Sequence, residues 1–167
     1  IYRTNRKLRI GTLGAVDVYY KGQEFIIRAI KKMREKGVDF EYLIIGGGDT
    51  SRLSGVAKDC GVEDLVQFTG PLPHDKILDT IDKIDIYAQP SLQEGLPRSV
   101  IEAMSRGCLT IGTKVGGIPE LVYPEYLFKK GDVNSIASIL EHITTDDLKN
   151  QAVKNYNAAK DYDVNEL

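Results

Sequence analysis

The sequence has few cysteines, no long apolar run and no excess of charge of one sign, and each absence excludes a class of protein. Cys60 and Cys108 are its only cysteines, too few for a disulfide framework or a metal-ligand cluster. We expect both to be free thiols in a reducing compartment. Apolar runs reach only a few residues, as in Leu43-Ile44-Ile45. The sequence therefore predicts neither a transmembrane helix nor a secretory leader.

Charge and composition are those of an ordinary globular domain. Lysine and arginine together number 22 and aspartate and glutamate 24, which gives a formal net charge of −2. This balance argues against a dedicated nucleic-acid-binding protein. Hydrophobic residues make up 42% and charged residues 28% of the chain, which argues against disorder, collagen and coiled coil. The 167 residues suffice for a single domain, residues 1–167, with a continuous core.

Short apolar segments alternate with segments of helical spacing along the whole chain. Strands are predicted at residues 8–13, 42–45, 65–68, 84–88, 109–112 and 126–128. A polar helix is predicted over residues 146–160, with an apolar stripe of Ala152, Val153, Tyr156 and Ala159. The alternation predicts an α/β fold, a Rossmann-like doubly wound parallel sheet of six strands.

The expected strand order predicts where a ligand binds. In the common order 3-2-1-4-5-6, strands one and four are neighbours, and ligands bind beyond their carboxyl ends. Two loops of unusual composition then border a crevice, residues 14–22 and residues 89–97. Topology and sequence therefore indicate the same place.

The second of these loops leads into a helix whose start suits a phosphate. Pro97 fits the first helical turn, and the amides of Gly95 and Leu96 are expected to face outward beside the positive end of the helix dipole. Glu102, in the second turn, tilts back toward the crevice that Glu94 borders. Amides beside two carboxylates suggest a ligand with both phosphates and hydroxyls. The alternative is that Glu94 only stabilises the helix start and that Glu102 is solvated.

Three further features of the sequence are candidates for ligand binding or catalysis. Lys21, at the end of the first loop, is placed to neutralise a diphosphate, and the alternative is an ordinary surface lysine. Residues 46–48 are three glycines without the spacing of a dinucleotide site, because Ser51 stands where the last glycine belongs, so we interpret them as a strand-to-helix turn. His74 starts a helix within approach of a bound base, whereas His142 is expected to be inert. No cysteine and histidine spacing indicates a metal site.

The loop and helix sequences match a known family. Residues 94–107 read E-G-L-P-R-S-V-I-E-A-M-S-R-G, and residues 112–120 read G-T-K-V-G-G-I-P-E. Two glutamates separated by seven residues, then E-A-M and G-G-x-P-E, resemble the donor-binding signature of the retaining GT-B glycosyltransferases of family four, the glycosyl transferases group 1. Supporting matches lie in the family's order at Lys21-Gly22, residues 44–48, Phe68-Thr69-Gly70 and Pro90-Ser91. The resemblance implies the C-terminal, donor-binding half of a GT-B enzyme.

The resemblance also implies a role for each matching residue. Glu94 would be the catalytic residue in contact with the donor sugar, and Glu102 would hold the ribose hydroxyls. Lys21 would neutralise the diphosphate, and the amides of Gly95 and Leu96 would help to position sugar and phosphate. The remaining implied donor contacts are Gly14 in the first loop, Pro97, and Leu72 in the loop 70–73 that borders the base.

The implied substrate is a nucleoside-diphosphate sugar whose hexose passes, with retention of configuration, to a glycan or lipid-linked acceptor. Neither a cofactor nor a metal is implied, and no nucleic acid partner. The N-terminal acceptor domain of such an enzyme is missing, and the chain begins at Ile1, so we expect an inactive piece of a longer bacterial-type enzyme of polysaccharide biosynthesis. The parent is expected in the cytoplasm, and peripheral association with the inner face of the membrane is compatible with the resemblance.

One departure from the family pattern keeps other interpretations open. The family commonly has an arginine directly after the first-strand glycine, but here Gly11 is followed by Thr12. Arg98 is the candidate substitute. A non-catalytic nucleotide-binding module of the same fold is therefore the main alternative. A Rossmann-type oxidoreductase domain is disfavoured, because the dinucleotide fingerprint is absent.

Overall fold

The computed structural model describes residues 6–162, which form a parallel sheet covered by helices. The six strands lie in the order β3-β2-β1-β4-β5-β6, and all neighbouring strands are parallel. This confirms the predicted doubly wound sheet and places β1 beside β4, so the topological switch point lies at the carboxyl ends of these two strands. The strands are β1 (Leu8–Leu13), β2 (Phe40–Ile45), β3 (Val66–Phe68), β4 (Ile86–Gln89), β5 (Leu109–Thr113) and β6 (Leu127–Phe128).

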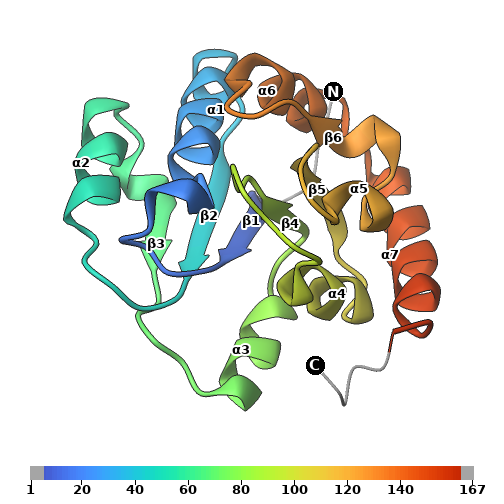
Figure 1. Cartoon of the computed structure of the whole chain (residues 1–167). Helices are drawn as coiled ribbons and strands as arrows, with labels where there is room; N and C mark the ends of the chain where they lie inside the picture. Colours follow the sequence, from blue (N-terminus) through green and yellow to red (C-terminus); the bar gives the residue numbers. More distant parts are fainter. Residues whose placement is uncertain (1–5, 163–167) are drawn as a thin grey trace.

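The helices pack in two groups, and Figure 1 shows α1 beside α6 and α4 near α7. α1 also contacts α2, while α4 also contacts α5. In the part of the chain that the structure describes, no helix is both long and apolar enough to cross a bilayer. The helices are α1 (Gln23–Glu35), α2 (Ser51–Asp59), α3 (His74–Ile81), α4 (Arg98–Ser105), α5 (Ile118–Leu121), α6 (Val133–His142) and α7 (Thr145–Ala159), with short 3-10 helices η1 (Tyr19–Lys21), η2 (Glu63–Leu65) and η3 (Pro124–Tyr126).

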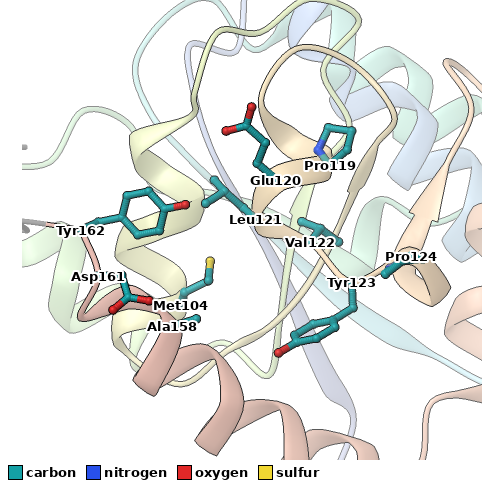
Figure 2. Close-up of a pocket in the computed structure, with 10 residues that line it drawn as sticks. All are labelled: Met104, Pro119, Glu120, Leu121, Val122, Tyr123, Pro124, Ala158, Asp161 and Tyr162. Atoms are coloured by element: carbon teal, nitrogen blue, oxygen red, sulfur yellow. The ribbon is translucent and has the colours of Figure 1, made fainter.

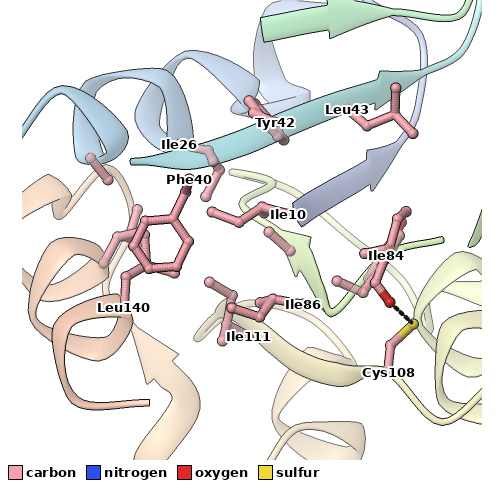
Figure 3. Packing of buried hydrophobic residues seen from close by; sticks show 14 of the residues in the cluster. Ile10, Ile26, Phe40, Tyr42, Leu43, Ile84, Ile86, Cys108, Ile111 and Leu140 are labelled. Carbon is pink, nitrogen blue, oxygen red and sulfur yellow. Dashed lines mark hydrogen bonds between the residues drawn. The ribbon is translucent and has the colours of Figure 1, made fainter. Parts of the chain in front are cut away.

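The hydrophobic core lies around the central strands (Figure 3). Ile10 of β1, Ile86 of β4 and Ile111 of β5 are fully buried. Phe40 and Tyr42 of β2 belong to the same cluster. A central parallel strand is covered on both faces, which explains why residues of β2 form an unbroken apolar run in the sequence.

Both cysteines are free, as predicted. The Sγ of Cys108 donates to the carbonyl oxygen of Ile84 at 3.6 Å (Figure 3). Burial raises the pKa of the Cys108 thiol to about 12, so this thiol stays protonated near neutral pH. Cys108 therefore packs as a small apolar residue of the core.

Side chains cap the starts of the last two helices. Asp132 caps α6 and accepts a hydrogen bond from the amide of Ser135 at 3.1 Å. At the start of α7, Thr144 and Asp147 each accept a hydrogen bond from the other's backbone amide, at 3.1 and 2.8 Å. This reciprocal capping box explains why a polar sequence begins a helix at this point.

The buried face of α7 differs from the prediction. The predicted stripe included Val153 and Tyr156, which are 62% and 51% exposed. Ala159 of the predicted stripe is buried, and the buried face also carries Gln151 and Asn155, which were not predicted. The Nδ2 atom of Asn155 donates to the carbonyl oxygen of Cys108 at 2.7 Å. α7 therefore docks on α4 and β5 partly through a polar contact, which apolar periodicity cannot reveal.

Candidate functional site

The loops that follow β1 and β4 meet at the predicted crevice. The amide of Leu92 donates to the carbonyl oxygen of Tyr20 at 2.7 Å and joins the two loops. Beside this bond, Gly22 has a φ of 72°, and a Cβ on it would collide with the carbonyl oxygen of Pro90. Only glycine allows so close an approach of the two backbones. Close packing of the two loops therefore explains why position 22, in the Lys21-Gly22 match, is a glycine.

The loop after β5 contacts the loop after β4. The amide of Gly117 donates to the carbonyl oxygen of Gly95 at 2.8 Å. Gly116 has a φ of 52°, and a Cβ on it would collide with the carbonyl oxygen of Glu94. The two parts of the sequence signature, residues 94–107 and 112–120, are therefore in direct contact in the fold.

Lys21 and Glu94 face each other across this crevice. The Nζ atom of Lys21 lies 3.5 Å from Oε1 of Glu94, and the two side chains are 26% and 12% exposed. Gly14, the first residue after β1, lies beside the stem of the lysine: the Cδ of Lys21 is 3.5 Å from where a Cβ on Gly14 would stand. The structure thus brings together three of the predicted site residues, and Lys21 is not an isolated surface lysine.

Buried neutral groups hold the carboxylate of Glu94. Its Oε1 accepts hydrogen bonds from the Nε2 of Gln89 at 2.7 Å and from the Oγ of Ser91 at 2.8 Å. Gln89 and Ser91 are 2% and 1% exposed. The alternative that Glu94 only stabilises the helix start is therefore insufficient, because its side chain points back to the end of β4.

Glu102 is more buried than a solvated surface acid would be. It lies in the second turn of α4 and is 8% exposed. Burial raises the pKa of the Tyr87 hydroxyl, and the negative charges of Glu102 and Glu94 raise it further. The alternative of a solvated Glu102 is wrong.

The start of α4 differs slightly from the expectation. Pro97 is the residue before the first helical turn, with a φ of −78° and a ψ of 112°, and α4 begins at Arg98. No side chain of the described residues caps this helix start. Leu96 beside it is 45% exposed. The first turn of α4 therefore lies at the positive end of the helix dipole without a side-chain cap.

Two other predictions concern the surroundings of the Lys21–Glu94 pair. Thr12, which stands where the family has an arginine, is 2% exposed, and its hydroxyl donates to the carbonyl oxygen of Ala88 at 2.9 Å. The hydroxyl of Tyr42 donates to Thr12 at 2.8 Å, so the side chain at position 12 is locked inside the fold. Leu72 is partly buried on the loop after β3. In the described residues it has no recorded contact with the Lys21–Glu94 pair.

A separate hollow lies between α5 and the end of α7 (Figure 2). Its volume is about 370 Å³. Glu120, the last residue of the G-G-x-P-E match, lines it together with Asp161 and Tyr162. Among residues 6–162 no group of three or more histidine, cysteine, aspartate or glutamate side chains is placed to hold a metal ion.

Sequence reasoning missed the hydrogen-bonding residues under Glu94. Tyr87 and Gln89 belong to β4, and Ser99 lies in the first turn of α4. The Oε1 of Gln89 accepts from the hydroxyl of Tyr87 at 3.0 Å and from that of Ser99 at 3.2 Å. The available signal was a glutamine at the end of an otherwise apolar central strand, because a buried amide there needs specific partners.

Comparisons with known proteins identify the family of the chain. The family model for glycosyl transferases group 1 matches residues 6–161. The amylovoran biosynthesis glycosyltransferase AmsK of Erwinia amylovora is 35% identical over 130 residues, which are 72% of this chain and 32% of that protein. The chain spans about a third of the length of the curated relatives it matches.

Solved structures share the fold. The C-terminal domain of a glycosyl transferase group 1 family protein (LpcC) from Francisella tularensis superposes with a TM-score of 0.81 and 21% identity, covering 96% of this chain and 94% of that one. HepE of Anabaena in complex with UDP-glucose has a TM-score of 0.82 and 23% identity, covering 95% of this chain and 45% of that one. The fold is that of the C-terminal half of a GT-B glycosyltransferase, and the chain belongs to the glycosyl transferases group 1 family.

Proposed function

We propose that the chain binds a nucleoside-diphosphate sugar beyond the carboxyl ends of β1 and β4, as the donor-binding domain of a retaining hexosyltransferase. The observation that carries this proposal is the pairing of Lys21 with Glu94 at 3.5 Å in the crevice, with Glu102 in the nearby second turn of α4. A cation, two carboxylates and a helix start match the diphosphate and hydroxyls of such a donor. The UDP-glucose bound to HepE, which has the same fold, supports this ligand class.

Each group in the crevice has a part in the proposed chemistry. Transfer breaks the bond between the anomeric carbon and a diphosphate oxygen, so negative charge grows on the leaving diphosphate. The ammonium group of Lys21 and the first amides of α4 stabilise that charge. Glu94 accepts hydrogen bonds from the donor sugar, and Glu102 accepts them from the ribose hydroxyls. Gly14, Gly95, Leu96, Pro97 and Leu72 shape the surrounding walls.

We further propose that the acceptor site belongs to a part of the enzyme outside residues 1–167. Because the curated relatives are about three times as long as the matched region, they contain room for such a domain. The name of AmsK, an amylovoran biosynthesis glycosyltransferase, supports a glycan or lipid-linked acceptor. The chain by itself then binds the donor and transfers no sugar.

Titration of the chain with UDP-, GDP- and ADP-glucose, by calorimetry and thermal unfolding, tests donor binding. One of the three should bind and raise the unfolding temperature by mass action. Glu102→Ala should weaken binding of the matching nucleoside diphosphate by about 1.5–3 kcal/mol, because the ribose hydroxyls lose a charged acceptor. Glu63→Ala, which removes an exposed carboxylate of η2, is the control and should leave the affinity unchanged. Failure of all three nucleotide sugars to bind would contradict the proposal.

A non-catalytic nucleotide-binding module is the second candidate function. It is favoured by Thr12, whose hydroxyl is committed to the hydrogen bond with the carbonyl oxygen of Ala88 and brings no positive charge. One measurement distinguishes the two functions. Sugar transfer by the longer protein that contains this chain supports the enzyme, whereas donor binding without transfer supports the module.

A further inference from the structure

Glu94 lies on a segment without regular secondary structure, so other groups must fix its side chain. Three donors approach one carboxylate oxygen, Oε1: the Nε2 of Gln89 at 2.7 Å, the Oγ of Ser91 at 2.8 Å and the Nζ of Lys21 at 3.5 Å. Within residues 6–162 the other oxygen, Oε2, receives no recorded hydrogen bond. One oxygen of Glu94 is thus anchored, and the other is available to a ligand in the crevice.

The orientation of the Gln89 amide is set by a chain of hydrogen bonds that starts at the end of β1. The backbone amide of Leu13 donates to the hydroxyl oxygen of Tyr87 at 3.1 Å. Because an N–H group can only donate, the tyrosine oxygen accepts this bond, and its own proton goes to the Oε1 of Gln89 at 3.0 Å. The hydroxyl of Ser99 donates to the same oxygen at 3.2 Å. With its oxygen held by two donors, the amide must present its NH₂ group to Glu94.

A flipped amide would turn its oxygen toward the carboxylate of Glu94, which can only accept when ionised. The hydroxyls of Tyr87 and Ser99 can donate as well as accept, so they suit the orientation in which the amide oxygen faces them and the NH₂ group faces Glu94. Gln89, Tyr87 and Ser91 are all nearly or fully buried, so the contacts are protected from competing water.

From this geometry we propose that Gln89 is a positioning residue for Glu94: its side-chain amide, oriented by Tyr87, anchors one oxygen of the carboxylate so that the other faces the donor sugar. The inference rests on the proposed function, in which Glu94 contacts the sugar. It assigns to Gln89 a role in recognising the sugar but none in recognising the nucleotide.

The experiment compares the binding of UDP and of UDP-glucose by calorimetry, in the wild-type chain and in Gln89→Leu. Loss of the anchor should weaken UDP-glucose about tenfold, the usual size for a lost hydrogen bond to a charged group, and should leave UDP within about twofold. A merely structural glutamine would change both affinities together. Equal weakening of both ligands, or no change in their ratio, would overturn the inference.

Two further variants separate the outcomes. Tyr87→Phe keeps the aromatic packing and removes the group that orients Gln89, so it should weaken UDP-glucose selectively by about threefold; it decides the question if Gln89→Leu fails to fold. Thr113→Val is the matched control: the Thr113 hydroxyl is fully buried and donates to the backbone oxygen of Gln89 at 3.3 Å, without reaching Glu94. It should keep the wild-type ratio. Where the chain binds GDP or ADP instead of UDP, the same comparison is made with that nucleotide and its glucose derivative. A wild-type chain that binds none of the three nucleotides and none of their glucose derivatives would defeat the proposed function itself, whereas normal binding with an unchanged ratio in the variants would defeat only the role of Gln89.

Discussion

Charged side chains are held differently at the two ends of the strands, which we call the amino edge, where the parallel strands start, and the carboxyl edge, where they end. At the amino edge, Arg34 binds Asp39 through two hydrogen bonds of 2.8 and 2.9 Å. Arg106 binds Asp82 through two hydrogen bonds in the same manner. At the carboxyl edge, Lys21 approaches Glu94 at a single distance of 3.5 Å, and neutral groups supply the shorter hydrogen bonds to Glu94.

This difference separates structural charges from those that suit a ligand. A bidentate pair uses both oxygens of the carboxylate and fixes the ends of the elements that it joins. The guanidinium groups of Arg34 and Arg106 accordingly hold the pKa values of Asp39 and Asp82 below their ordinary range. In the crevice, a lysine ammonium with three donors and a carboxylate with one anchored oxygen keep capacity for another molecule.

The largest expected effect comes from the close backbone contact at the carboxyl edge. Gly116→Ala should lower the free energy of unfolding by about 3 kcal/mol, because the methyl group adds a collision with the backbone of Glu94 to the cost of a left-handed conformation. Gly61→Ala is the control at the amino edge, where φ is 68° and nothing lies near the added Cβ. It should cost about 1 kcal/mol. Urea unfolding measures both, and equal losses would show that the crevice loops are not tightly joined.

The second largest effect is expected on nucleotide affinity when the ammonium group of Lys21 is removed. Lys21→Ala should weaken UDP binding by about 2 kcal/mol and leave uridine binding unchanged, because only the diphosphate presents charge to the ammonium group. Added salt should weaken wild-type UDP binding through screening. Arg106→Ala, at the amino edge, should reduce stability without changing the affinity for UDP. If Arg98→Ala weakens UDP binding and Lys21→Ala does not, the assignment of the diphosphate to Lys21 is wrong.

The paired charges at the amino edge should make the stability of the protein depend on pH in the acid range. Asp39→Asn should lower stability by about 1 kcal/mol at pH 7, since one of the two carboxylates bound to Arg34, the other being Asp64, loses its charge. The folded-state pKa of Asp39 is depressed, so its contribution is present above the unfolded pKa of about 3.9 and is lost as pH falls through the folded value. The difference between wild type and variant should therefore shrink below about pH 4. Unfolding midpoints measured from pH 7 to pH 2.5 check this, and a gap that grows in acid would contradict it.

The smallest effect is expected on the outer face of α7. Val153→Ser should change the free energy of unfolding by less than about 0.5 kcal/mol, because the side chain is already exposed. Asn155→Ala, on the inner face, should cost about 1 kcal/mol through the lost hydrogen bond to the carbonyl oxygen of Cys108. Thermal unfolding of both variants compares the two faces. A larger loss of stability for Val153→Ser than for Asn155→Ala would support the apolar stripe predicted from the sequence.

Local patterns allowed most of the elements to be predicted. Apolar runs marked the central strands, because this signal arises from contacts within a few residues. The start of β2 at Phe40 lies a short way before the predicted limit at residue 42. Only part of the buried face of α7 was predicted, since the partner of Asn155 is the backbone of Cys108, 47 residues earlier in the chain.

The sequence alone determined the doubly wound fold, the family and the two loops that border the crevice, because alternation and spacing are local and the strand order follows from general topological rules. The tertiary structure decided how the site is held. It placed Lys21 opposite Glu94, locked Thr12 away from the crevice, and joined Leu13, Tyr87 and Gln89 into one chain of hydrogen bonds. These contacts join residues up to 76 positions apart in the chain. Their directions depend on which group can donate and which can accept, and that is settled only when the strands lie side by side.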